Sequence, residues 1–100
     1  MKTLGSTLRE LRENKQLPLR TVAAYLDIDQ AILSRIERGQ RKASREQVAK
    51  LADYFNVSKE ELLVAWLSDK IVYEIGDEHL GIEALKVAEE KVKYNKIRQL

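Results

Sequence analysis

Apolar residues recur at intervals of three and four along most of the chain, which is the spacing of one face of an α-helix. In residues 4–15, Leu4, Leu8 and Leu11 keep this spacing, and charged residues cover the opposite side. No segment shows the convincing alternation of a half-buried strand. The pattern predicts an all-α fold.

Residues with special backbone preferences mark the ends of the next two helices. Pro18 suits the first turn of a second helix, because that position needs no backbone N–H donor. The stretch 27–29 interrupts the apolar pattern, and Asp29 is placed to cap a third helix that runs to about Arg38. Gly39 then supplies the left-handed residue at which a helix stops. The sequence therefore predicts two short helices joined by a tight turn.

Three more helices are expected after this pair. A capping box is a serine followed three residues later by Gln or Glu, and it begins a fourth helix at Ser44 and a fifth at Ser58. The fifth helix is rich in apolar residues and ends at Gly76. A last amphipathic helix is expected from about residue 78 to residue 99.

Composition narrows the class of protein. With 44% hydrophobic and 34% charged residues, the 100-residue chain can bury the core of one small domain and remain soluble. It contains no cysteine, which excludes disulfides and thiolate metal sites. No apolar run is long enough to span a membrane, and the first residues lack a signal-peptide pattern. We expect a cytoplasmic protein with no membrane association, no metal and no cofactor.

Candidate catalytic groups are few. His79 is the one histidine, and its acidic neighbours Asp77 and Glu78 are more typical of a solvated surface than of a metal site. No glycine-rich phosphate loop is present, and no acidic pair has a pattern that indicates acid–base chemistry. The sequence does not predict an enzyme.

Positive charge is concentrated in the first half of the chain. Residues 1–50 hold 11 Lys and Arg against 6 Asp and Glu, a balance of +5, whereas residues 51–100 hold 7 against 10, a balance of −3. Between residues 34 and 45 five basic residues face a single acid, Glu37. Such a patch fits contacts to phosphate, but an ordinary solvated loop rich in Lys and Arg would look the same on charge alone.

The segment that carries the most information is residues 17–39, LPLRTVAAYLDIDQAILSRIERG. The second helix of this segment, which is the third helix of the chain, offers Gln30, Ser34 and Arg35 at helical spacing. Their side chains can reach the floor of a DNA major groove. This arrangement favours a DNA-binding helix-turn-helix.

Three stretches in order, LGSTLRELRENKQLP, VAAYLDIDQAILSRIERGQRKAS and QVAKLADYFNVSKEELL, resemble the Xre/Cro-type helix-turn-helix family of lambda-repressor-like domains. The resemblance covers roughly residues 4–67, and its most specific part is the hexapeptide at residues 34–39, SRIERG. It implies a five-helix lambda-repressor-like domain in residues 1–67, whose third helix lies in the major groove.

The resemblance also implies roles for single residues. Base contacts fall to Gln30, Ala31, Ser34 and Arg35, because Gln can bond adenine, Arg can bond guanine and an Ala methyl can contact thymine. Phosphate contacts fall to the start of the second helix and to the basic loop after the third. The residues of this second set are Arg20, Thr21, Arg38, Arg41, Lys42 and Arg45. The alternative to base contact is that Gln30 and Ser34 are ordinary polar residues on an exposed helix face.

In similar domains an arginine late in the first helix pairs with the glutamate of the third. The resemblance therefore implies a structural brace between Arg12 and Glu37, and Glu37 is not expected to read bases. Three positions depart from the family pattern: Leu19 stands where a glutamine often bonds a phosphate, Asp27 where the turn often has glycine, and Ala43 where proline often follows the basic loop.

Residues 68–100 lie outside the resemblance. The fifth helix carries more apolar residues than the domain needs, so we expect a C-terminal helical extension used for dimerisation or partner binding. The candidate interface residues are Trp66, Ile71, Val72, Leu85 and Val92. A homodimer is the preferred interpretation, because small helix-turn-helix domains commonly bind pseudo-palindromic sites as dimers.

The sequence thus predicts a sequence-specific regulator that binds double-stranded DNA, with repression by a dimer as the default mechanism. An antitoxin that represses its own operon and a restriction–modification controller use the same DNA-binding domain and remain open. A third alternative is an adaptor that binds proteins and has lost DNA binding. The exposed face of the third helix is polar and cationic, which argues against the adaptor, because a protein-binding surface has no need for such a face.

Overall fold

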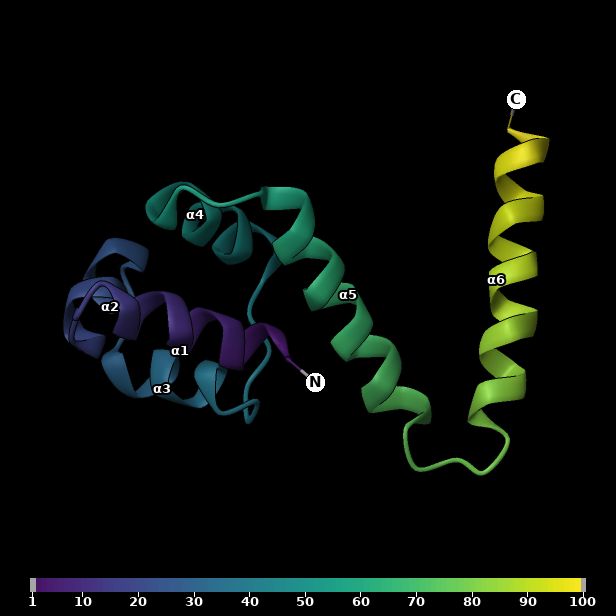
Figure 1. Cartoon of the computed structure of the whole chain (residues 1–100), viewed down its shortest axis with the longest axis horizontal. Coiled ribbons are helices and arrows are strands. Elements are labelled where there is room, and N and C mark those ends of the chain that lie inside the picture. Colours follow the sequence, from purple (N-terminus) through teal and green to yellow (C-terminus); the bar gives the residue numbers. More distant parts are fainter. Residues whose placement is uncertain (1, 100) are drawn as a thin grey trace. The chain divides into compact units, whose positions relative to one another are not determined.

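The computed structural model describes residues 2–99, which form six helices and no strand. The helices are α1 (Leu4–Asn14), α2 (Leu19–Leu26), α3 (Gln30–Glu37), α4 (Arg45–Phe55), α5 (Lys59–Ile75) and α6 (Gly81–Arg98). Figure 1 shows them in sequence order. The all-α fold and the five helices followed by one additional helix are confirmed.

The chain divides into two compact units between Lys70 and Ile71, slightly beyond the limit at residue 67 that the sequence predicts for the first domain. Helix α5 begins in the first unit and continues into the second. Within residues 2–99, no helix has both the length and the apolar character needed to cross a bilayer.

The core of the first unit lies among α1–α4 and the first part of α5. Helix α3 packs against both α1 and α2, and α2 also packs against α4. Leu8, Val22, Leu33, Val48 and Leu51 are fully enclosed there. Helices α1 and α3 approach closely at Gly5 of α1, where an added Cβ would lie 2.5 Å from the carbonyl oxygens of Ile36 and Glu37. Only glycine allows α1 to pass this close to the end of α3.

The helices begin and end largely where the local chemistry predicts. Ser44 and Gln47 form the expected capping box of α4, and Ser58 Oγ accepts a hydrogen bond from the Glu61 N–H at the start of α5. A further capping box that the sequence analysis did not identify begins α1, between Thr3 and Ser6. Local hydrogen bonds therefore fix the register of these helices before tertiary packing is considered.

Trp66 is placed differently from the expectation. The sequence analysis assigned it to a dimer or partner interface, but its side chain is only 8% exposed and belongs to the hydrophobic core. Its indole Nε1 donates a 2.7 Å hydrogen bond to the carbonyl oxygen of Ala43. The assignment was wrong because helical spacing places the exposed apolar residues of α5 on a different side of the helix from Trp66. These residues are Val64, Leu67, Ile71 and Val72.

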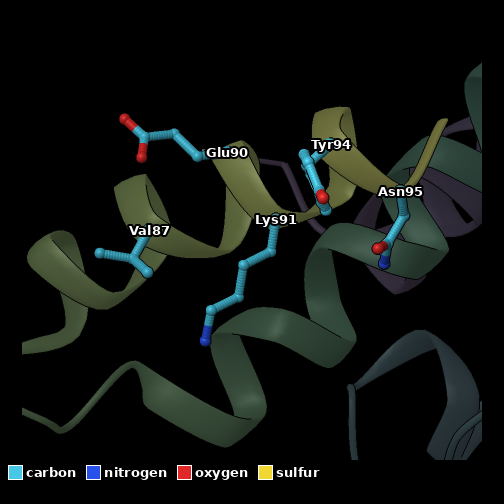
Figure 2. A pocket seen from close by; sticks show the side chains of 5 residues that line it. All are labelled: Val87, Glu90, Lys91, Tyr94 and Asn95. Carbon is cyan, nitrogen blue, oxygen red and sulfur yellow. The ribbon is translucent and has the colours of Figure 1, made fainter. Parts of the chain in front are cut away.

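The second unit consists of the end of α5, a short connection and α6. Gly81 is buried where α6 begins, and an added Cβ there would lie 2.8 Å from the carbonyl oxygen of Ile75, so the close contact requires glycine. Most side chains of α6 are exposed, including the apolar ones of Leu85 and Val92. Figure 2 shows a depression on α6 whose lining residues are all exposed: Val87, Glu90, Lys91, Tyr94 and Asn95.

Candidate nucleic-acid interface

The turn between α2 and α3 is built by three consecutive residues. Asp27 adopts the left-handed conformation, with φ 56° and ψ 45°, which an aspartate accepts more readily than most residues. The N–H of Ile28 then bonds the carbonyl oxygen of Ala23 at 3.0 Å and closes α2. Asp29 caps α3 by accepting a 2.8 Å hydrogen bond from the Ala31 N–H. The first residues of α3 after this turn, Gln30 and Ala31, are exposed.

Helix α3 has one buried face and one exposed face. Leu33, Ile36 and Glu37 are buried against the rest of the unit. The expected base-contacting residues occupy the other side: Gln30, Ala31 and Arg35 are exposed and Ser34 is partly exposed. The four residues follow helical spacing, so the fold brings them together on one surface.

Arg12 and Glu37 form the ion pair that the resemblance implied. Arg12 Nε donates to Glu37 Oε2 at 2.7 Å and Nη2 to Oε1 at 3.0 Å, while Nη1 bonds the carbonyl oxygen of Leu17 at 2.8 Å. The side chains are 13% and 5% exposed. The hydrogen bond to Glu37 raises the pKa of Arg12 above its ordinary value, so the guanidinium stays charged throughout the physiological range.

This pair changes the charge that α3 and its loop present to solvent. Glu37 is the only acid between residues 34 and 45, and its carboxylate is buried and neutralised by Arg12. The exposed charges of this segment are therefore all positive. They belong to the exposed residues Arg35, Arg38, Arg41, Lys42 and Arg45.

The basic loop is fixed at both ends. Gly39 has φ 74°, and the Gln40 N–H bonds the carbonyl oxygen of Arg35 at 2.8 Å, which closes α3. At the other end Ala43 is buried and its carbonyl oxygen accepts the hydrogen bond from Trp66. Two basic side chains of this region also interact within the protein. Arg38 Nε donates a 3.3 Å hydrogen bond to the carbonyl oxygen of Ser34, and Lys42 takes part in an interaction as well.

The remaining expected phosphate contacts, Arg20 and Thr21, lie in the first turn of α2 and are exposed. Leu19, which replaces the usual glutamine, is half-buried and packs against the core, so it offers no polar group there.

Two long-range polar contacts of this unit were not anticipated. Asp69 of α5 accepts a 2.9 Å hydrogen bond from the Leu4 N–H at the start of α1, and Trp66 holds Ala43 as described. Lys70 Nζ lies 3.5 Å from the centroid of the Trp66 ring, and Arg45 Cζ lies 5.2 Å from it. No local sequence pattern predicts these contacts, because the partners are far apart in sequence. The only sequence signal for a polar environment of the tryptophan was the number of charged residues near it on α5.

Comparison with known proteins decides the family. A family model described as a helix-turn-helix domain matches residues 3–65, which includes α1–α4 and the first part of α5. The chain belongs to the helix-turn-helix domain family. The resemblance predicted from the sequence is thereby confirmed.

Similar members of this helix-turn-helix family are named as regulators. The chain is 36% identical over 66 residues to the uncharacterized HTH-type transcriptional regulator RghRB of Bacillus subtilis, and these cover 65% of the chain and 48% of RghRB. The chain thus matches about half the length of this curated relative.

Two solved structures of helix-turn-helix regulators are also similar. The restriction-modification controller protein C.AhdI of Aeromonas hydrophila is 37% identical with a TM-score of 0.54, covering 59% of this chain and 89% of C.AhdI. The clp gene regulator ClgR of Corynebacterium glutamicum is 26% identical with a TM-score of 0.56, covering 91% of this chain and 83% of ClgR. Because 91% of the chain cannot fit into the first unit alone, the similarity to ClgR includes part of the C-terminal extension.

Proposed function

We propose that this protein is a sequence-specific transcriptional regulator that binds double-stranded DNA as a homodimer on a pseudo-palindromic operator, and that it acts as a repressor. The observation that carries the proposal is the exposed surface of α3 and its loop. There Gln30 and Arg35 project from the recognition helix, and every exposed charge between residues 34 and 45 is positive. The similar proteins that are named as regulators support the same proposal.

Sequence reading is assigned to the first turns of α3. Gln30 is suited to the N6 and N7 edge of adenine and Arg35 to the O6 and N7 edge of guanine, while Ala31 offers a methyl group to thymine. Ser34 stands beside them at the next turn. Arg20, Thr21, Arg38, Arg41, Lys42 and Arg45 are assigned to the phosphates, where they set the register of the protein on the duplex.

The C-terminal unit supports a homodimer. On α6 a stripe without charges runs along one side through Ala84, Leu85, Ala88, Val92 and Asn95. The first half of the helix, residues 81–90, carries three acids and one base, and the second half, residues 91–98, carries four bases and no acid. Two copies of α6 that pack antiparallel around a two-fold axis would place each acidic half against a basic half.

Repression by steric exclusion is the simplest mechanism for such a dimer. A dimer that occupies one helical turn of duplex in each half-site excludes other proteins from the same DNA.

The first experiment is selection from random-sequence duplexes by the purified full chain at two salt concentrations. We expect a retained palindrome with half-sites about 10 bp apart, bound less tightly as salt rises. Recovery of no motif, or binding that disappears at physiological salt, would contradict the proposal.

Variants of the recognition helix then test the residue assignment. Arg35→Ala should weaken binding to the selected duplex by about 1–3 kcal/mol and relax the preference at one base pair of each half-site. Gln30→Ala should act in the same way at a different base pair. Arg9→Ala removes an exposed arginine from α1 and serves as the matched control, with affinity close to wild type.

A narrower candidate function is control of a restriction–modification system. The specific observation in its favour is the 37% identity to C.AhdI over 89% of that protein. The test is transcription of a reporter from the chain's own upstream region, with and without the protein, where the gene lies next to a nuclease and a methyltransferase. A genomic neighbourhood without these genes would exclude this candidate and leave the general proposal in place.

A further inference from the structure

A cluster of aromatic and cationic side chains joins α5 to the start of α4. The Trp66 ring has Lys70 Nζ at 3.5 Å from its centroid and Arg45 Cζ at 5.2 Å. Since both distances are measured from the same point, the two positive charges are separated by at most their sum, about 8.7 Å. That is comparable to the Debye length of about 8 Å at physiological ionic strength, so the charges are only partly screened from one another and can act together on a nearby anion.

The neighbouring acids do not form ion pairs with these two charges. Asp69 precedes Lys70, but its carboxylate accepts the Leu4 N–H at 2.9 Å. Glu46 follows Arg45, but it pairs with Lys50 at 3.3 Å. Among residues 2–99, neither Arg45 nor Lys70 forms an ion pair with a carboxylate.

The position of the cluster is set by buried contacts. Trp66 is 8% exposed, and its indole N–H bonds the carbonyl oxygen of Ala43, the last residue of the basic loop before the Ser44 cap. The indole is therefore a fixed platform, while Arg45 is exposed and Lys70 partly exposed. The platform directly adjoins the loop whose exposed charges are all positive.

We propose that Arg45 and Lys70, positioned by the Trp66 indole, form one phosphate-binding site that takes a DNA backbone phosphate flanking the bases read by α3. Lys70 lies beyond the region that the family model matches, so this contact extends the interface onto α5. The inference rests on the DNA-binding function proposed above and adds a contact to it. A phosphate between the two charges would relieve their mutual repulsion, which gives the unpaired cations a partner.

The test is the salt dependence of affinity of the full chain for the selected duplex. Each phosphate contact contributes about 0.9 to the slope of log K against log salt concentration. Lys70→Gln should reduce the magnitude of the slope by about 0.9, and Lys70→Arg, which keeps the charge, should restore it. Lys59→Gln is the matched control, because it removes an exposed lysine from the first turn of the same helix, and its slope should equal that of the wild type.

Trp66 supplies a second readout, since it is the only tryptophan of the chain. Saturating duplex should change its emission in the wild type, and Lys70→Gln should reduce that change. Circular dichroism of the variants checks that each remains helical to the same extent as the wild type.

The outcomes separate the two proposals. An unchanged salt slope in Lys70→Gln, or a Trp66 emission that does not respond to duplex, would overturn the phosphate site while leaving DNA binding intact. A wild type that selects no duplex would overturn the proposed function, and the phosphate site with it.

Discussion

At the scale of single residues, the buried pair of Arg12 and Glu37 joins stability to surface charge. Glu37 is the one acid between residues 34 and 45, and the bidentate contact removes its charge from the surface. The third hydrogen bond of Arg12, to Leu17, ties the same guanidinium to the connection between α1 and α2. One side chain therefore links three parts of the first unit.

Removing one partner should be costly. Glu37→Gln leaves Arg12 charged and poorly paired in a mostly buried site, so we expect the free energy of unfolding to fall by about 3–5 kcal/mol. Glu13→Gln breaks the exposed pair with Arg9 and should cost less than about 1 kcal/mol. Urea denaturation followed by circular dichroism measures both; equal losses would show that the buried pair has no special role.

The same pair is predicted to orient α3. The double variant Arg12→Met with Glu37→Leu replaces both charges by apolar groups, and most of the lost stability should return. If the pair braces the recognition helix, this stable variant should still bind the selected duplex more weakly than the wild type. Wild-type affinity in the double variant would assign the pair to stability alone.

At the scale of elements, α3 depends on its N-terminal cap. The helix is only Gln30–Glu37, and a helix this short is marginal without capping and packing. The Asp29 carboxylate bonds the Ala31 N–H at the end where the expected base-reading residues begin. The local cap therefore holds the part of the helix on which sequence recognition is proposed to depend.

Asp29→Ala should lower the free energy of unfolding by about 1 kcal/mol, because it removes the cap. Asp29→Asn removes the same negative charge but keeps an oxygen that can accept the bond, so its stability should stay close to wild type. On the selected duplex the Ala variant should bind more weakly than the Asn variant. Identical behaviour of the two would mean that the carboxylate charge, not the cap, is what matters at this position.

At the scale of the whole molecule, the second unit exposes apolar side chains of the kind that are buried in the core of the first unit. Ile71, Val72, Leu85 and Val92 are all exposed, at 45%, 63%, 38% and 54%. The charge-free stripe of α6 and the opposite charges of its two halves are the basis for the proposed antiparallel pairing of two copies. Four of the five residues expected at an interface thus remain available for it, and Trp66 does not.

Val92→Glu places a charge in the α6 stripe and should convert the dimer to a monomer, because an unpaired carboxylate would be buried in the interface. Val87→Glu is the matched control: Val87 is similarly exposed, at 50%, but lies off the stripe and should leave the dimer intact. Sedimentation velocity gives the oligomeric state of each. A monomeric wild type would contradict the dimer, as would a dimer that Val92→Glu does not dissociate.

Local chemistry was sufficient to predict the helices, and the resemblance of three sequence stretches predicted the family. Apolar spacing gave the number and order of the six helices, and the signals at Asp29, Gly39 and Ser44 gave several of their ends, because caps and left-handed residues act within one turn. The candidate recognition residues of α3 were accessible for the same reason: helical spacing decides which side chains share a face.

Tertiary structure decided what depends on partners distant in the chain. Trp66 and Ala43 are 23 residues apart and Asp69 and Leu4 are 65 apart, and no sequence pattern specifies which distant group will meet which. Packing placed Trp66 in the core although its apolar neighbours on α5 are exposed, and it brought Lys70 and Arg45 to the same ring. The sequence by itself determined the helices and the face that α3 presents, because those follow from short-range periodicity. The burial of Trp66 and the cationic cluster around it required the three-dimensional arrangement of the basic loop, α4 and α5.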